Sequence, residues 1–121
     1  MLIVDNDPHC LMALRLLVES DGHQATVAMG GEAGIAVFLD ALRGPESFTV
    51  VMTDMAMPHV DGRKVAGAVK AASPRTLVLL VSGSDEFSLN LAGAPQVDFV
   101  LCKPPKRSDL RRALATLEHR A

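Results

Sequence analysis

The sequence predicts an α/β protein built on a parallel β-sheet with helices on both faces, in three layers. Apolar runs that read as strands alternate with helical patterns five times along the 121 residues, and strict alternation of this kind produces parallel sheets. Hydrophobic residues make up 49% of the chain, which is enough for a core and too many for a disordered chain. This length suits one domain, so we expect residues 1–121 to form a single domain.

The first strand and helix are predicted within residues 2–22. The apolar run 2–4 is short enough to be a buried strand. Asp7 followed by Pro8 combines a capping residue with a first-turn proline, which is a typical helix start. One apolar face then repeats at helical spacing over Leu11, Leu14, Leu17 and Val18. We expect this helix to end at residues 21–22, which are Asp and Gly.

The second strand–helix pair occupies residues 23–42. Residues 23–29 have the β-branched content and the length of a strand, and residues 30–42 have a helical pattern. Gly44 and Pro45 then break the helix.

The third pair has its strand at residues 48–53 and its helix at residues 62–72. We expect the inner face of that helix to consist of Val65, Ala68, Val69 and Ala72.

The remaining strands are predicted at residues 77–81 and 97–101. The run 77–81 is continuously apolar, which indicates burial on both faces of the sheet. A short, weakly patterned helix at residues 85–91 separates the two strands. A last helix follows the fifth strand, and we expect Ser108 to cap it.

Polar residues follow four of the predicted strands, at the edge where parallel sheets bind ligands. The first strand leads into Asp5, Asn6 and Asp7, the third into Asp54, the fourth into Ser82 and the fifth into Lys103. Oxygen ligands from Asp5, Asn6 and Asp54 suit a hard cation such as Mg²⁺. A carboxylate beside Mg²⁺ can act as a nucleophile toward phosphorus, and a lysine would neutralise the phosphoryl oxygens.

These strand ends resemble those of response-regulator receiver domains, the phosphate-accepting modules of two-component signalling. The matching segments are IVDND at 3–7, TDMAMPHVDG at 53–62, VSG at 81–83 and VLCKP at 100–104. The resemblance covers essentially the whole chain. It implies a flavodoxin-like fold with the strand order 2-1-3-4-5, and a phosphoryl group taken up from a histidine kinase or a phosphotransfer protein.

The resemblance also implies a role for individual residues. Asp54 is the expected phosphoacceptor. Asp5 and Asn6 occupy the positions of the acidic pair that holds Mg²⁺, and the backbone carbonyl of Ala56 completes the protein ligands.

On the phosphate side of the site, the resemblance assigns the switch hydroxyl to Ser82 and the phosphate-binding ammonium to Lys103. It further implies a cis bond between Lys103 and Pro104. The chain is either a single-domain regulator or a piece of a longer protein whose output domain or hybrid kinase lies outside it.

Two positions depart from the family pattern. Asn6 stands where the family usually has a directly ligating aspartate, and the missing negative charge should weaken Mg²⁺ binding. Val100 stands where many members carry a Tyr or Phe that moves inward on activation. These departures leave a second interpretation open, in which the chain is a degenerate receiver that serves as a phosphorylation-independent interaction module.

Other function classes fit the sequence poorly. A net charge of −2, with four Phe and no Trp or Tyr, argues against direct binding of nucleic acid. The glycines of residues 30–34 follow the second strand and lack the spacing of a dinucleotide-binding motif. A haloacid-dehalogenase-like phosphatase would need an aspartate where Ala56 stands. We therefore expect a phosphate acceptor and not a turnover enzyme.

The remaining polar residues and the cysteines have structural interpretations. We expect Asp7 to cap the first helix, residues 61–62 to close a loop, and His59 to be an exposed loop residue. Cys10 and Cys102 are predicted to be small core residues in a reducing compartment. The longest aliphatic run, residues 77–81, is far too short to cross a membrane. We therefore expect a cytoplasmic protein without membrane partners.

Overall fold

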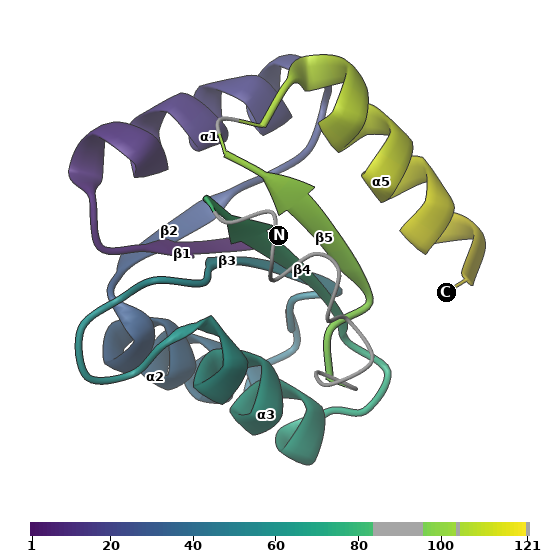
Figure 1. The fold of residues 1–121 in the computed structure, drawn as a ribbon. Helices are drawn as coiled ribbons and strands as arrows, with labels where there is room; N and C mark the ends of the chain where they lie inside the picture. The colour runs from purple at the N-terminus through teal and green to yellow at the C-terminus, as the bar shows by residue number, and fades with distance from the viewer. Residues whose placement is uncertain (84–95, 104, 121) are drawn as a thin grey trace.

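Five parallel strands form one sheet in the order β2-β1-β3-β4-β5, as the resemblance implied (Figure 1). The computed structural model describes residues 1–83, 96–103 and 105–120, and side chains up to residue 116. The strands are β1 (Leu2–Asp5), β2 (Thr26–Met29), β3 (Val50–Asp54), β4 (Leu77–Ser82) and β5 (Phe99–Cys102). The described helices are α1 (Pro8–Ser20), α2 (Gly31–Leu42), α3 (Gly62–Ala72) and α5 (Arg107–Arg120).

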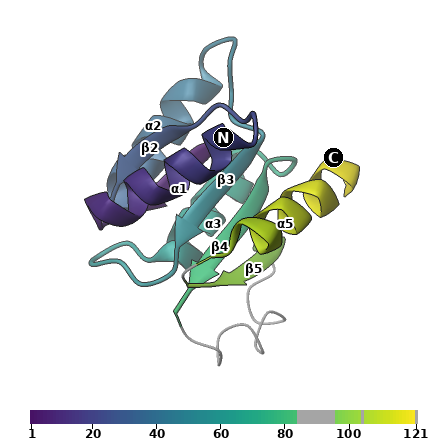
Figure 2. The same cartoon turned by 90° about the horizontal axis from the view of Figure 1, so that it is seen from above.

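The helices cover both faces of the sheet, which confirms the predicted three-layer α/β fold. Helices α1 and α5 lie on one face and α2 and α3 on the other (Figure 1). Figure 2 looks onto the first face, where α1 and α5 lie in front of the sheet. One apolar core fills each interface, because side chains of successive strand residues point to opposite faces. Ile3 and Met52, for example, pack under α1 and α5, whereas Val4 and Val51 pack under α2 and α3.

Several element boundaries differ from the prediction for identifiable reasons. Strand β2 begins at Thr26 and not at residue 23, because pairing with β1 starts only where the Thr26 amide bonds the Met1 carbonyl (2.9 Å). Strand β3 extends one residue further than predicted and ends on Asp54 itself. The bounds of α3 match the prediction, but Ala66 and not Ala72 belongs to its buried face.

The expected cap of α5 is wrong. The helix begins at Arg107, so Ser108 lies inside its first turn. The Leu110 amide donates a hydrogen bond to the Lys106 carbonyl (2.9 Å), and Ser108 lies within the turn that this bond closes. An N-cap residue must lie outside the helical backbone, and Ser108 therefore has no such role.

The expectation that both cysteines are core residues is also wrong. Cys102 is exposed and Cys10 is only half-buried. Cys102 is the last residue of β5, which lies at the edge of the sheet among the described strands.

Two sequence predictions fall outside the described residues: the helix at 85–91 and the cis bond before Pro104. Within the described ranges, none of the helices has both the length and the apolar character that a membrane crossing requires.

Candidate functional site

Asp54 is held at the end of a fully buried strand. All five residues of β3 are buried, and the strand lies between β1 and β4 in the middle of the sheet. Asp54 pairs in register with Val81 of β4, and only 5% of its surface is exposed. The Thr53 hydroxyl donates a hydrogen bond to the Asp54 carbonyl oxygen (3.0 Å). A strand paired on both sides thus gives this carboxylate a rigid base.

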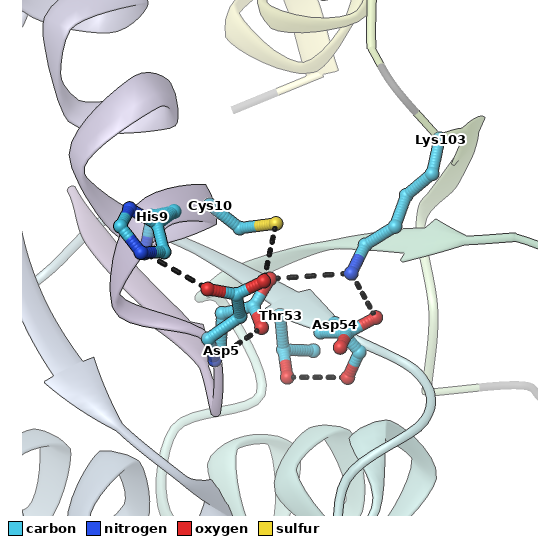
Figure 3. Close-up of polar contacts among 7 residues, drawn as sticks. Asp5, His9, Cys10, Thr53, Asp54 and Lys103 are labelled. Atoms are coloured by element: carbon cyan, nitrogen blue, oxygen red, sulfur yellow. Dashed lines mark hydrogen bonds and ion pairs between the residues drawn. The ribbon is translucent and has the colours of Figure 1, made fainter.

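Lys103 joins the two buried carboxylates of the site (Figure 3). Its Nζ lies 3.0 Å from Asp54 Oδ1 and 3.3 Å from Asp5 Oδ2. Asp5 ends β1 and is 1% exposed, whereas the lysine directly follows β5 and keeps 28% of its side chain exposed. The parallel topology therefore brings together three sequence-predicted residues, the last of them 98 positions from the first.

Two carboxylates and one ammonium give this cluster a formal charge of −1. Burial raises the pKa of Asp54, and the negative charge of Asp5 adds to the rise despite the bond from Lys103. Burial alone would lower the pKa of Lys103, but the bonds and charges of Asp54 and Asp5 outweigh it and raise that pKa. The excess of negative charge contributes to both shifts, since it favours the protonated form of acids and bases alike.

The loop after Asp54 folds back tightly. The Met55 amide donates to the Val81 carbonyl, and the Gly62 amide donates to the Met55 carbonyl, both at 2.9 Å. A Cβ on Gly62 would lie 2.5 Å from the Asp54 carbonyl oxygen, so only glycine fits at this return point. The backbone amide of Ala56 opposes the rise in the pKa of Asp54, an influence that sequence reasoning missed because backbone donors leave no signal in the side-chain pattern.

The turn within that loop has a strained residue. His59 is exposed, as predicted, and has a positive φ of 67°, a conformation that few residues other than glycine adopt. Asp61 closes the loop as predicted, because its side chain accepts the Lys64 amide (3.1 Å) and caps α3.

The three polar residues after β1 have different environments. Asp5 Oδ1 accepts the Asp7 amide (3.0 Å), which fixes the buried carboxylate. Asp7 caps α1 as predicted, since Oδ1 accepts the His9 amide (2.9 Å) and Oδ2 accepts the Cys10 thiol (3.5 Å). Asn6 lies between them with an exposed side chain. Of the expected acidic pair, only Asp5 is therefore buried in the cluster.

Ser82 is the last residue of β4 and is 2% exposed. Its carbonyl accepts the Lys103 amide (2.9 Å), so the backbone that carries the lysine is bonded to this serine. Ser82 also follows Val81, the register partner of Asp54. The structure thus places the predicted hydroxyl residue at the same edge of the sheet as the carboxylates.

The donor set fits a hard cation bound through few protein ligands. Asp5 and Asp54 supply buried carboxylate oxygens, and the backbone of Ala56 and the amide of Asn6 lie in the loops beside them. In the part of the chain that the structure describes, no three side chains of His, Cys, Asp or Glu form a group that could hold a metal. Mg²⁺ needs no such cage, because it commonly keeps several waters and takes one or two carboxylates.

The sequence matches the family model for the response regulator receiver domain over residues 1–115. A similar characterised relative is the positive alginate biosynthesis regulatory protein of Pseudomonas aeruginosa. It is 32% identical over 117 residues, which cover 94% of this chain and 45% of that protein. The curated relatives that match include transcriptional regulatory proteins and a sensor protein, and the chain spans 45% or less of each one's length.

Solved structures show the same fold. A response regulator receiver domain protein from Clostridium thermocellum is 27% identical and superposes with a TM-score of 0.87, covering 98% of this chain and 93% of that one. The response regulator protein TrrA from Thermotoga maritima, solved in complex with Mg²⁺ and beryllofluoride, is 22% identical. Its TM-score is 0.83, with 96% of each chain covered.

Proposed function

We propose that this chain, which belongs to the response regulator receiver domain family of two-component signalling, accepts a phosphoryl group on Asp54 with the help of Mg²⁺. The observation that carries the proposal is the pairing of Lys103 with both buried carboxylates, at 3.0 Å from Asp54 and 3.3 Å from Asp5. The cluster retains a formal charge of −1 and lies at the carboxyl ends of the strands, where α/β proteins bind ligands.

The proposed reaction forms one bond and breaks one. A carboxylate oxygen of Asp54 attacks the phosphorus of a phosphohistidine, and the new bond joins that oxygen to phosphorus. The bond between phosphorus and the imidazole nitrogen breaks, and the electron pair stays on the nitrogen. The ammonium of Lys103 lies beside the Asp54 carboxylate and can bond the oxygens of the phosphoryl group there. The Ser82 hydroxyl would supply a further hydrogen-bond donor.

Asp5, Asp54, Asn6 and the Ala56 carbonyl are the residues that would hold Mg²⁺. The metal would supply the positive charge that offsets the phosphoryl oxygens. Asp5 and Asp54 provide the negative charge that attracts the cation. The backbone bonds of Met55 and Gly62 fix the loop that carries Ala56.

The phosphodonor in this proposal is a histidine kinase or a phosphotransfer protein. The sensor protein and transcriptional regulators among the relatives support partners of this kind. Those relatives are more than twice as long as the matched segment, so a linked output domain or hybrid kinase is part of the same proposal.

The test is phosphorylation by a small phosphodonor, such as acetyl phosphate, with the intact mass as the readout. We expect a mass gain of one phosphoryl group that requires Mg²⁺ and is absent from Asp54→Asn. Equal behaviour of the two proteins would contradict the proposal.

A second candidate function rests on Asn6, which replaces a negative charge at the metal site. In that case the chain is a degenerate receiver that binds partners without phosphorylation. Titration with Mg²⁺ and beryllofluoride separates the two functions. Saturable binding that depends on Asp54 supports the phosphoacceptor, and no binding at millimolar Mg²⁺ supports the interaction module.

A further inference from the structure

The glycine-rich turn between β2 and α2 contacts the end of β1 and the loop that follows β3. Gly30 has φ +94°, which a residue with a side chain rarely adopts, and it is the N-cap residue of α2. Its amide donates a hydrogen bond to the carbonyl oxygen of Asp5 (2.9 Å). Gly30 is therefore bonded to the backbone of Asp5, the residue whose buried carboxylate lies at the end of β1.

The next residue, Gly31, is pressed against the loop that follows Asp54. A Cβ on Gly31 would lie 2.7 Å from Val60 Cγ1 and 2.8 Å from Val60 Cβ, and it would be closer still to the Val60 carbonyl oxygen. Such distances are well below van der Waals contact, so any larger residue must move the loop or the start of α2. Because the nearest atom belongs to the backbone, a change of side-chain rotamer cannot relieve the overlap.

Val60 has little freedom to move by itself. Its amide donates to the Pro58 carbonyl (2.7 Å), and two residues later the Gly62 amide closes onto Met55. The loop is also tightly packed at Gly62, where an added Cβ would lie only 2.5 Å from the Asp54 carbonyl oxygen. A push on Val60 is therefore transmitted to the backbone on both sides of Ala56.

We infer that Gly31 is a positioning residue, which sets the place of the Asp54–Gly62 loop relative to Asp5. Gly30 and Gly31 are adjacent, and one bonds Asp5 while the other contacts Val60, so the turn connects the end of β1 to the loop that follows Asp54. Gly31 does not itself touch the expected metal or phosphoryl group. The functional meaning of this inference rests on the proposed phosphoacceptor function.

Three glycine variants separate positioning from stability. Gly31→Ala introduces the overlap with Val60. Gly30→Ala strains a positive φ where nothing lies within 4 Å of the new Cβ, so it tests loss of stability without a push on the loop. Gly67→Ala, on α3, adds a Cβ in open space and controls for the substitution itself.

Two readouts are needed. The first is the backbone amide spectrum of ¹⁵N-labelled protein without metal, in particular the signals of Ala56 and Gly62. The second is the rate of phosphorylation by acetyl phosphate and Mg²⁺ per folded molecule, with folding checked by circular dichroism and urea unfolding.

We expect Gly31→Ala to shift the Ala56 and Gly62 signals and to slow phosphorylation about 10- to 100-fold, since a displacement of about 1 Å can cost 100-fold. Gly67→Ala should match the wild type in both readouts. Gly30→Ala should lower the unfolding midpoint and shift the Ala56 and Gly62 signals less than Gly31→Ala does. If Gly31→Ala leaves the loop signals in place, or Gly30→Ala moves them equally, the inference is wrong.

A second variant covers the case in which Gly31→Ala fails to fold. Val60→Ala removes the side-chain part of the same contact, Cγ1, and leaves the carbonyl oxygen and Cβ in place. We expect it to shift the Ala56 and Gly62 signals and to slow the reaction up to several-fold. Unchanged signals in Val60→Ala would overturn the inference. If the wild type is not phosphorylated at all, the proposed function fails, whereas the amide shifts still decide whether Gly31 positions the loop.

Discussion

The ammonium of Lys103 lies 3.0 Å from Asp54 Oδ1, and it bonds the Asp5 carboxylate as well, at 3.3 Å. One cation thus serves two buried acids, and the cluster keeps a formal charge of −1. This imbalance contributes to the raised pKa of both Asp54 and Lys103. It also determines how the protein should respond when a charge is added to or removed from the site.

Adding a carboxylate should strengthen the metal site. We expect Asn6→Asp to bind Mg²⁺ about 10- to 100-fold more tightly, because each 1.4 kcal/mol of added attraction is worth a factor of ten. The readout is a Mg²⁺ titration followed by amide chemical shifts. The matched control is Gln24→Glu, which adds the same charge at an exposed position just ahead of β2. Equal Mg²⁺ affinities of the two variants would contradict the expected ligand position of Asn6.

Removing Lys103 should destabilise the protein without metal. Lys103→Ala leaves two buried carboxylates without their shared cation, and we expect the free energy of unfolding at pH 7 to fall by about 1–3 kcal/mol. The loss stays below that of a fully buried pair because the lysine side chain is 28% exposed. Urea unfolding measures it, with the exposed Lys106→Ala as control. If both variants lose the same stability, the ion pairs contribute nothing measurable.

The pKa of Asp54 predicts a pH dependence of stability with a definite sign. A carboxyl group whose pKa is higher in the folded state than its ordinary 3.8 binds protons more tightly there. Its contribution to stability is fully present below pH 3.8 and is lost as the pH rises through the raised value. The difference in unfolding free energy between Asp54→Asn and the wild type should therefore grow in favour of the variant from about pH 3.5 to about pH 7. A difference that shrinks over this range would show that the pKa is lowered instead.

The cap of α3 should contribute independently of the charged cluster. Asp61→Ala removes the side-chain acceptor of the Lys64 amide, and we expect a loss of about 1 kcal/mol in the free energy of unfolding. Asp61→Ser keeps a capping oxygen and should retain most of that stability. A Ser variant as unstable as Ala would mean that the cap is not the source of the effect.

The sequence predicted most of the sheet, and with it the meeting of three polar strand ends, because both follow local patterns. Strand β3 reads as an apolar run that ends on a carboxylate, and the parallel topology then brings Asp5, Asp54 and Lys103 to one edge. The family resemblance supplied the strand order, which periodicity alone does not determine.

Features that depend on contacts between distant segments could not be predicted. Gly31 and Val60 belong to segments that meet only in the folded chain. The sequence therefore carries no indication of why glycines occur at residues 30 and 31. The exposure of Cys102 follows from its place at the end of an edge strand, and composition carries no such information. The start of α5 shows the same limit, since Ser108 has the residue type of a cap and lies inside the helix.

The most direct test of the proposed function is to locate the phosphoryl group. Wild-type protein is treated with acetyl phosphate and Mg²⁺, the acyl phosphate is reduced with borohydride, and the peptides are mapped by mass spectrometry. We predict that the reduced residue is Asp54 and that Asp5 and Asp61 are unmodified. Modification at another carboxylate, or at none under conditions that phosphorylate Asn6→Asp, would contradict the claim that Asp54 of this chain is a functional phosphoacceptor.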